Sequence, residues 1–258
     1  MNYFFFTSNE FVVSKLQIPK FNNAGKRDDT LSLFGAYVQQ NSWEFYKVDC
    51  REDDNFNFLS SKADNNNHIF FYHSNLSPAD FSGVLTKPSH FCHTSPAFRA
   101  NLMIENNLGG FSSYQSEYPF AMTQINSSMV SSGGNLTYCG AKNCGVFIRN
   151  ITSKPLIDKH ELFIWDEDEE KILDKVSIFS NSTNFVCLKK FLNNGQNIGL
   201  FCNTMVGIPI FVVEYENGSL SFEHTHPPHE NVHGENRYKL VKSYKSKIGD
   251  KIFKNHLA

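Results

Sequence analysis

The sequence predicts a mainly β protein. Two observations carry this prediction: apolar runs of about four to eight residues recur along the chain, and clusters of Asn, Asp, Gly, Ser and Pro separate them. Composition is the third, since 25 Phe and 10 Tyr among 258 residues supply ample aromatic area for a core. This length is near the upper limit for one hydrophobic core, so we expect one large β domain or two smaller parts.

The N-terminal part, residues 1–138, is predicted to be β-rich. Its first quarter contains the strand-like runs NYFFFTS, EFVVSKL, LSLFGAYVQ, WEFYKVDC and HIFFYHS. The stretch from about residue 89 to residue 137 is less periodic. We interpret it as longer strands, such as AFRANLMIEN and SSYQSEYPFAMTQ, joined by turns at NNLGG and SSGGN, where glycine permits positive φ.

Residues 139–234 are predicted to form an immunoglobulin-like β-sandwich packed on the N-terminal part. From Cys144 onward, strand-like runs and turns alternate at intervals of about 8 to 12 residues, which is typical of a sandwich. The acidic run from Asp166 to Glu170 interrupts ELFIWDEDEEKILDKVSIF. We interpret this run as the polar tip of a hairpin, because a calcium loop needs a more regular spacing and a glycine.

Residues 235–258 are predicted to contain a short amphipathic helix. Its apolar stripe has spacings of three and four: Tyr238, Val241, Tyr244 or Lys245, Ile248 and Ile252. Most lysines of this segment lie on the face opposite the apolar stripe. We expect the stripe to dock on the sandwich with the lysines in solvent; the alternative is an anchor for an anionic membrane surface or an acidic partner.

Charge and targeting signals narrow the class of protein. The chain has 24 Lys and Arg against 26 Asp and Glu, which argues against nucleic-acid binding. Its N-terminus has no basic segment, and no run approaches the roughly 18 to 20 apolar residues of a membrane span.

The six cysteines are scattered, several in apolar runs, which is typical of buried thiols in the cytoplasm. Glycine-rich nucleotide loops, a G-x-S-x-G elbow and H-E-x-x-H are absent, which disfavours nucleotide-dependent enzymes and serine hydrolases.

The strongest functional signal is a histidine cluster in GSLSFEHTHPPHENVHGEN. On a strand, His224 and His226 point to one face, because side chains alternate with period two. The two prolines that follow end the strand, so that His229 or Glu230 can supply a third ligand. Two imidazoles with a carboxylate or a third imidazole form the ligand set of catalytic zinc and of non-haem iron. The alternative is an exposed His-rich turn.

Part of this stretch resembles the first metal motif of the cupin family, which is a glycine, five residues, H-x-H, three or four residues and then Glu. Gly218, His224, His226 and Glu230 match that half-motif. The second cupin motif has no counterpart downstream, so we do not assign the chain to the family. The resemblance implies that this spacing can hold a divalent metal.

Two further groups complete the predicted site. In KPSHFCHTSPAFRAN, His90 and His93 flank Cys92 and are candidates for a further metal ligand or an acid/base group; the alternative is a polar loop. In GGFSSYQSEYPFAMT, a continuous strand would place one pair of side chains, Tyr114 and Tyr118, on one face and Gln115 and Glu117 on the other.

Arg99 is a candidate for bidentate binding of a carboxylate or phosphate. Together these side chains would bind a polar substrate. The alternative is that the tyrosines cover the edge of the core while Glu117 pairs with Arg99.

We therefore expect a metal-dependent enzyme, a hydrolase, isomerase or oxygenase, acting on a small polar or carbohydrate-like substrate. His224, His226, His229 and Glu230 would hold zinc or iron, and His90, His93 and Glu117 would be catalytic. A second hypothesis is a non-catalytic sandwich that recognises a glycan or a protein. Assembly into a homo-oligomer through sheet edges is a third.

Overall fold

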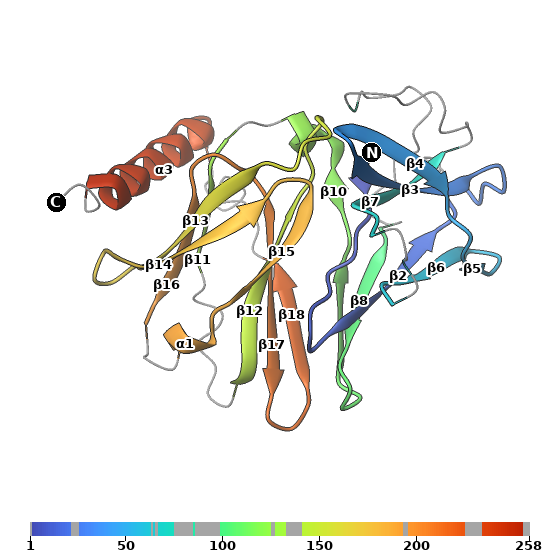
Figure 1. Cartoon of the computed structure of the whole chain (residues 1–258), viewed down its shortest axis with the longest axis horizontal. Helices are drawn as coiled ribbons and strands as arrows, with labels where there is room; N and C mark the ends of the chain where they lie inside the picture. Colours follow the sequence, from blue (N-terminus) through green and yellow to red (C-terminus); the bar gives the residue numbers. More distant parts are fainter. Residues whose placement is uncertain are drawn as a thin grey trace.

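The computed structural model describes residues 2–21, 26–62, 64, 67–74, 85, 99–124, 127–132, 141–192, 196–224 and 234–254. Over these residues the chain is mainly β, as predicted, and it is built from small antiparallel sheets (Figure 1).

The N-terminal part contributes three sheets. Its elements are β1 (Asn2–Tyr3), β2 (Val13–Pro19), β3 (Ser32–Gln39), β4 (Ser42–Lys47), β5 (Arg51–Glu52), β6 (Phe56–Ser60), β7 (Phe70–Ser74), β8 (Asn101–Glu105), β9 (Phe111–Gln115), β10 (Tyr118–Pro119) and the 3₁₀ helix η3 (Phe120–Gln124). The sheet orders are β5-β6-β2-β8-β9, β4-β3-β7 and β1-β10. Strand β9 is therefore an edge strand.

The C-terminal part contributes two four-stranded sheets. Its elements are β11 (Met129–Ser132), β12 (Ala141–Asn150), β13 (Lys159–Asp166), β14 (Lys171–Phe179), β15 (Ser182–Cys187), α1 (Lys189–Leu192), β16 (Ile198–Cys202), β17 (Ile208–Tyr215), β18 (Leu220–His224) and α3 (Arg237–Lys254). The sheet orders are β11-β16-β13-β14 and β15-β12-β17-β18. Both sheets contribute to one apolar cluster, so they pack face to face.

The sheet β15-β12-β17-β18 is covered on both faces. On β12, Val146 and Ile148 point into the cluster shared with the other C-terminal sheet, whereas Phe147 belongs to the core of the N-terminal part. This is why β12 and β17 are continuous apolar runs, VFI and IPIFVV, and do not alternate with polar residues. The middle sheet thus joins the two parts through a common core (Figure 1).

The predicted acidic hairpin tip is confirmed. Strands β13 and β14 pair from Lys159 to Asp166, and residues 167–170 form the turn between them. The Asp166 carboxylate accepts hydrogen bonds from the backbone N–H groups of Asp168 and Glu169, at 3.0 and 3.1 Å. The acidic residues therefore build a turn.

The predicted C-terminal helix is also confirmed as α3, but its docking face differs. Val241, Ile248 and Ile252 are buried. Ile248 and Ile252 pack in one apolar cluster with Phe163 and Trp165 of β13 and Phe201 of β16. Gly249 permits this approach, since a Cβ atom there would lie 3.2 Å from the Phe201 ring.

The expectation that Tyr238 docks is wrong, because this side chain is 60% exposed. Of the two alternatives at the next position of the stripe, Tyr244 is 50% exposed. Lys245 occupies that part of the buried stripe and donates to the Ser128 carbonyl at 2.6 Å. Among the residues described, no helix is long and apolar enough to cross a membrane.

Candidate functional site

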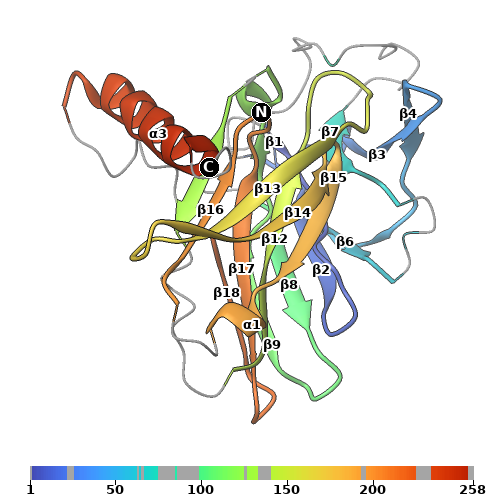
Figure 2. The ribbon, with the colours of Figure 1, turned by 60° about the vertical axis from the view of Figure 1, so that its left-hand side comes forward.

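Edge strands from the two parts meet at one place. Strand β9 ends the five-stranded N-terminal sheet, and β18 ends the middle sheet; the two strands are in contact (Figure 2). At their meeting point the ring centroids of Tyr114 and His224 are 4.4 Å apart, with an interplanar angle of 52°. Two predicted site residues that are far apart in sequence are thus neighbours.

The strand alternation explains this contact. On β18, Leu220, Phe222 and His224 share the face that packs on the core of the N-terminal part, whereas Glu223 points outward. On β9, Tyr114 points inward between exposed neighbours. Both aromatic side chains are half-buried and lie at the margin of the shared core.

Arg99 lies next to this pair. Its Nε atom is 3.1 Å from a carboxylate oxygen of Glu117, and its Nη1 atom donates to the amide oxygen of Gln115. The Arg99 side chain is 37% exposed and that of Glu117 is 11% exposed, so the carboxylate is held on the protein side of the ion pair. The pairing of Arg99 with Glu117, which the sequence offered as the alternative to a substrate-binding role, is present.

Charges of both signs act on the Tyr114 hydroxyl. Burial raises the pKa of Tyr114, the positive charge of Arg99 lowers it, and the negative charge of Glu223 raises it. Glu223 was not among the predicted site residues, although its position before His224 could have indicated it. We call Arg99, Tyr114, Gln115, Glu117, Glu223 and His224 the β9–β18 junction.

Tyr118 lies apart from this junction. The expectation that Tyr114 and Tyr118 share a strand face is wrong, because β9 ends at Gln115 and Tyr118 lies on β10, paired with Tyr3. Ser116 makes the break: its N–H donates to the Ala100 carbonyl, and its hydroxyl donates to the Phe5 carbonyl at 2.8 Å. Tyr118 is fully buried, and burial raises its pKa to about 12.

The remaining predicted site residues, His90, His93, His226, His229 and Glu230, lie outside the described residues. Within the part of the chain that the structure describes, no three His, Cys, Asp or Glu side chains are grouped so as to hold a metal ion. Of the four predicted metal ligands, the structure thus places His224 alone.

Hydrogen bonds around a buried carboxylate connect the β8–β9 hairpin, which contains β9, to the β17–β18 hairpin, which contains β18. The Asn106 side-chain amide, in the β8–β9 turn, donates to the buried Glu214 carboxylate at 3.0 Å and to the Gly218 carbonyl at 2.9 Å. Asn143 donates to the other Glu214 oxygen at 2.6 Å. A Cβ atom on Gly110 would lie 1.9 Å from the Gly218 oxygen, so glycine is required where the turns meet.

Comparisons of this chain with protein family models, with curated proteins and with solved structures gave no match.

Proposed function

We propose that the β9–β18 junction is part of a divalent-metal-dependent enzyme site for a small polar or carbohydrate-like substrate. One observation carries the proposal: His224, the first predicted metal ligand, lies against Tyr114, a predicted substrate-binding residue, at 4.4 Å. Arg99, Gln115 and Glu117 lie at the same end of β9. A metal ligand, a cation and a carboxylate within one surface region are the components that such chemistry needs.

Each residue has a definite role in this proposal. His224 would bind zinc or iron together with His226 and with His229 or Glu230, and His90 or His93 would add a ligand or an acid/base group. The metal would act as a Lewis acid or activate water, zinc suiting hydrolysis or isomerisation and iron suiting oxygen chemistry. Arg99 and Gln115 would orient the substrate, and Glu117 would transfer a proton.

Metal content tests the proposal. Protein purified without a histidine tag, loaded with zinc and desalted, should retain about one zinc per chain, and His224→Ala with His226→Ala should abolish this. His160→Ala is the matched control, because His160 is a surface histidine on β13 that contacts Thr204. A wild-type content near zero, or a content unchanged in the double variant, would falsify the metal site.

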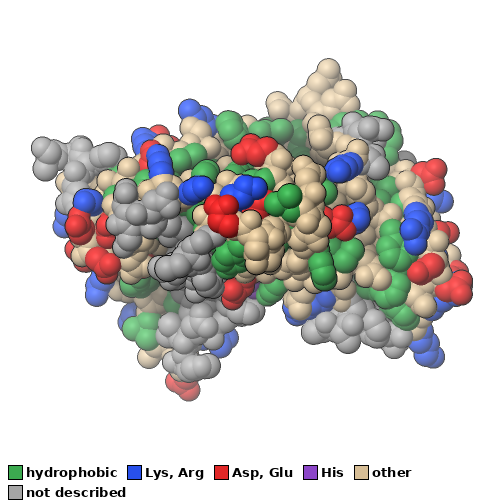
Figure 3. All heavy atoms as spheres, turned by 90° about the horizontal axis from the view of Figure 1, so that it is seen from below, with side chains coloured by type: hydrophobic (Ala, Val, Ile, Leu, Met, Phe, Trp, Pro, Cys, Tyr) green, Lys and Arg blue, Asp and Glu red, His purple; other side chains and the backbone are tan. Residues whose placement is uncertain are grey.

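A second function has one observation in its favour. Phe111 on β9 and Leu108 in the preceding turn are 70% and 62% exposed. The face at the ends of the β8–β9 and β17–β18 hairpins presents hydrophobic side chains among charges of both signs (Figure 3). Such an edge suits a non-catalytic protein that recognises a glycan or a partner protein. Binding that is lost in Phe111→Ala and insensitive to metal chelation would favour this function.

For the C-terminal part we propose the immunoglobulin-like arrangement. It is supported by the pairing of β13 with β14 and β16 and of β12 with β15, which matches the pairing of strand C with C′ and F and of strand B with E. Strand β17 departs from that pattern, because it pairs with β12 and not with β16.

A further inference from the structure

Helix α3 lies at one side of the molecule (Figure 2) and is rich in basic residues. It contains seven basic residues against one acidic residue, Asp250, whereas the whole chain has a formal net charge of −2. The basic residues are Arg237, Lys239, Lys242, Lys245, Lys247, Lys251 and Lys254. The remainder of the chain therefore carries a net negative charge, whereas α3 carries a net positive charge.

The docking of α3 leaves a second stripe in solvent. The buried stripe is Val241, Lys245, Ile248 and Ile252, while Leu240, Tyr244, Lys247, Lys251 and Lys254 repeat at spacings of four and three along a neighbouring face. Leu240 is 55% exposed and Tyr244 is 50% exposed. This outward stripe combines apolar side chains at one end of the helix with cations toward the other.

Most of the charge on α3 is not used within the fold. Lys251 forms an ion pair with Glu170 of the β13–β14 turn, and Lys245 is bonded to Ser128. Lys239, Lys247 and Lys254 are exposed, and within the described part of the chain no acidic side chain forms an ion pair with them. In the part of the chain that the structure describes, these three lysines face solvent.

We propose that the outward stripe of α3 binds the surface of an anionic lipid bilayer, with the helix lying along that surface. Charge complementarity selects an anionic partner, because α3 carries seven cations against one carboxylate. The exposed Leu240 and Tyr244 favour a bilayer over other polyanions, because leucine and tyrosine side chains enter the region between headgroups and acyl chains. This inference is independent of the metal site.

Vesicle sedimentation tests the proposal with the full-length protein. We expect binding to phosphatidylcholine vesicles that contain phosphatidylserine, no binding to phosphatidylcholine alone, and weaker binding as salt is raised. Lys247→Glu with Lys254→Glu should weaken binding at least about tenfold, since each lysine near an anionic surface contributes about fivefold. Leu240→Ser with Tyr244→Ser should also weaken binding while leaving the helix charge unchanged.

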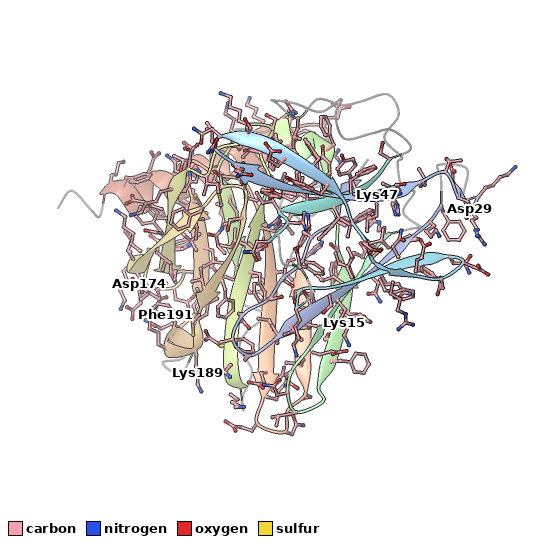
Figure 4. The ribbon with its side chains drawn as sticks, turned by 45° about the vertical axis from the view of Figure 1, so that its right-hand side comes forward. Lys15, Asp29, Lys47, Asp174, Lys189 and Phe191 are labelled. Carbon is pink, nitrogen blue, oxygen red and sulfur yellow. The ribbon has the colours of Figure 1, made fainter. Side chains whose placement is uncertain are left out.

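The matched control is Lys47→Glu with Lys62→Glu, which makes the same change in net charge on the N-terminal part; Figure 4 shows Lys47 far from α3. Absence of binding to the anionic vesicles, or equal losses in the control and in the α3 variants, overturns the proposal. Binding that needs the lysines but is unaffected by Leu240→Ser with Tyr244→Ser, and that polyglutamate removes, would assign the surface to an acidic protein and overturn it too.

Discussion

His73 on β7 makes the stability of the fold sensitive to acid. Its side chain is buried, its Nε2 atom lies 2.8 Å from the Asn57 amide nitrogen, and its ring packs edge-on against Phe4. Burial and, as the smaller cause, the positive charge of Lys20 together lower the pKa of His73 to about 4. The folded protein therefore keeps this imidazole neutral.

Because the pKa of His73 is lower in the folded than in the unfolded state, the unfolded chain binds a proton first as the pH falls. We expect the free energy of unfolding to decrease between about pH 6.5 and pH 4, by up to roughly 3 kcal/mol from this group. Urea unfolding at several pH values measures this. His73→Leu should flatten the pH dependence, and His160→Ala, at a partly exposed histidine, should largely preserve it. An unchanged slope in His73→Leu would contradict the assignment.

Single residues were predictable where the evidence is local. The pairing of Arg99 with Glu117 follows from their separation across a short hairpin, and the Asp166 turn follows from its composition. The contact of Tyr114 with His224 was not predictable, because it depends on how two edge strands from different parts of the chain meet. Proximity of this kind is set by tertiary packing, which a period-two pattern does not encode.

Among the elements, strand positions followed from apolar runs and turn residues, but strand ends did not. The stretch SSYQSEYPFAMTQ reads as one strand, yet Ser116 binds the N-terminal segment and the chain then turns into the 3₁₀ helix η3. The period of α3 was predicted correctly. Its docking face was predicted at Val241, Ile248 and Ile252 but not at Tyr238, and helical spacing left either Tyr244 or Lys245 on the stripe; the structure places Lys245 there, bonded to the Ser128 carbonyl.

Asn106 connects the β8–β9 hairpin to the β17–β18 hairpin. Its Nδ2 donates to Glu214 and Gly218, and its Oδ1 accepts from the N–H groups of Leu108 and Gly110. Asn106→Ala removes these bonds and one donor to a buried carboxylate, so we expect a loss of about 2 to 4 kcal/mol in unfolding free energy.

Asn217→Ala is the matched control for this change. Asn217 lies in the exposed β17–β18 turn and bonds only locally among the described residues, to Ser219, so its loss should cost under about 1 kcal/mol. Chemical denaturation measures both variants. Equal costs would mean that Asn106 does not hold the hairpins together.

At the scale of the whole molecule, the two predicted parts share their largest core. Side chains of the middle sheet, including Phe147, Ile210 and Phe222, pack in one cluster with Phe70 and Leu102 of the N-terminal part. The sequence predicted β-rich segments on both sides of residue 138. The sequence indicates that both faces of β12 are buried only through its continuous apolar run. Such a run does not show which part of the protein covers each face.

This shared core predicts a single cooperative unfolding transition. Trp43 lies in the common core, and its indole N–H donates to the Ser153 carbonyl, whereas Trp165 lies beneath α3. Fluorescence of the single-tryptophan variants Trp165→Phe and Trp43→Phe therefore reports on the two parts separately. With far-ultraviolet circular dichroism as a common reference in each variant, we expect the fluorescence and dichroism midpoints to coincide. A tryptophan midpoint displaced from the dichroism curve would indicate two independently folding domains.

The central claim is that His224 holds a metal beside Tyr114 at the junction of the two edge strands. Anomalous diffraction at the zinc edge, from crystals of zinc-loaded protein, tests it most directly. We predict a peak about 2.0 to 2.1 Å from a ring nitrogen of His224. An ordered His224 with no peak beside it, or peaks confined to other residues, would contradict the claim.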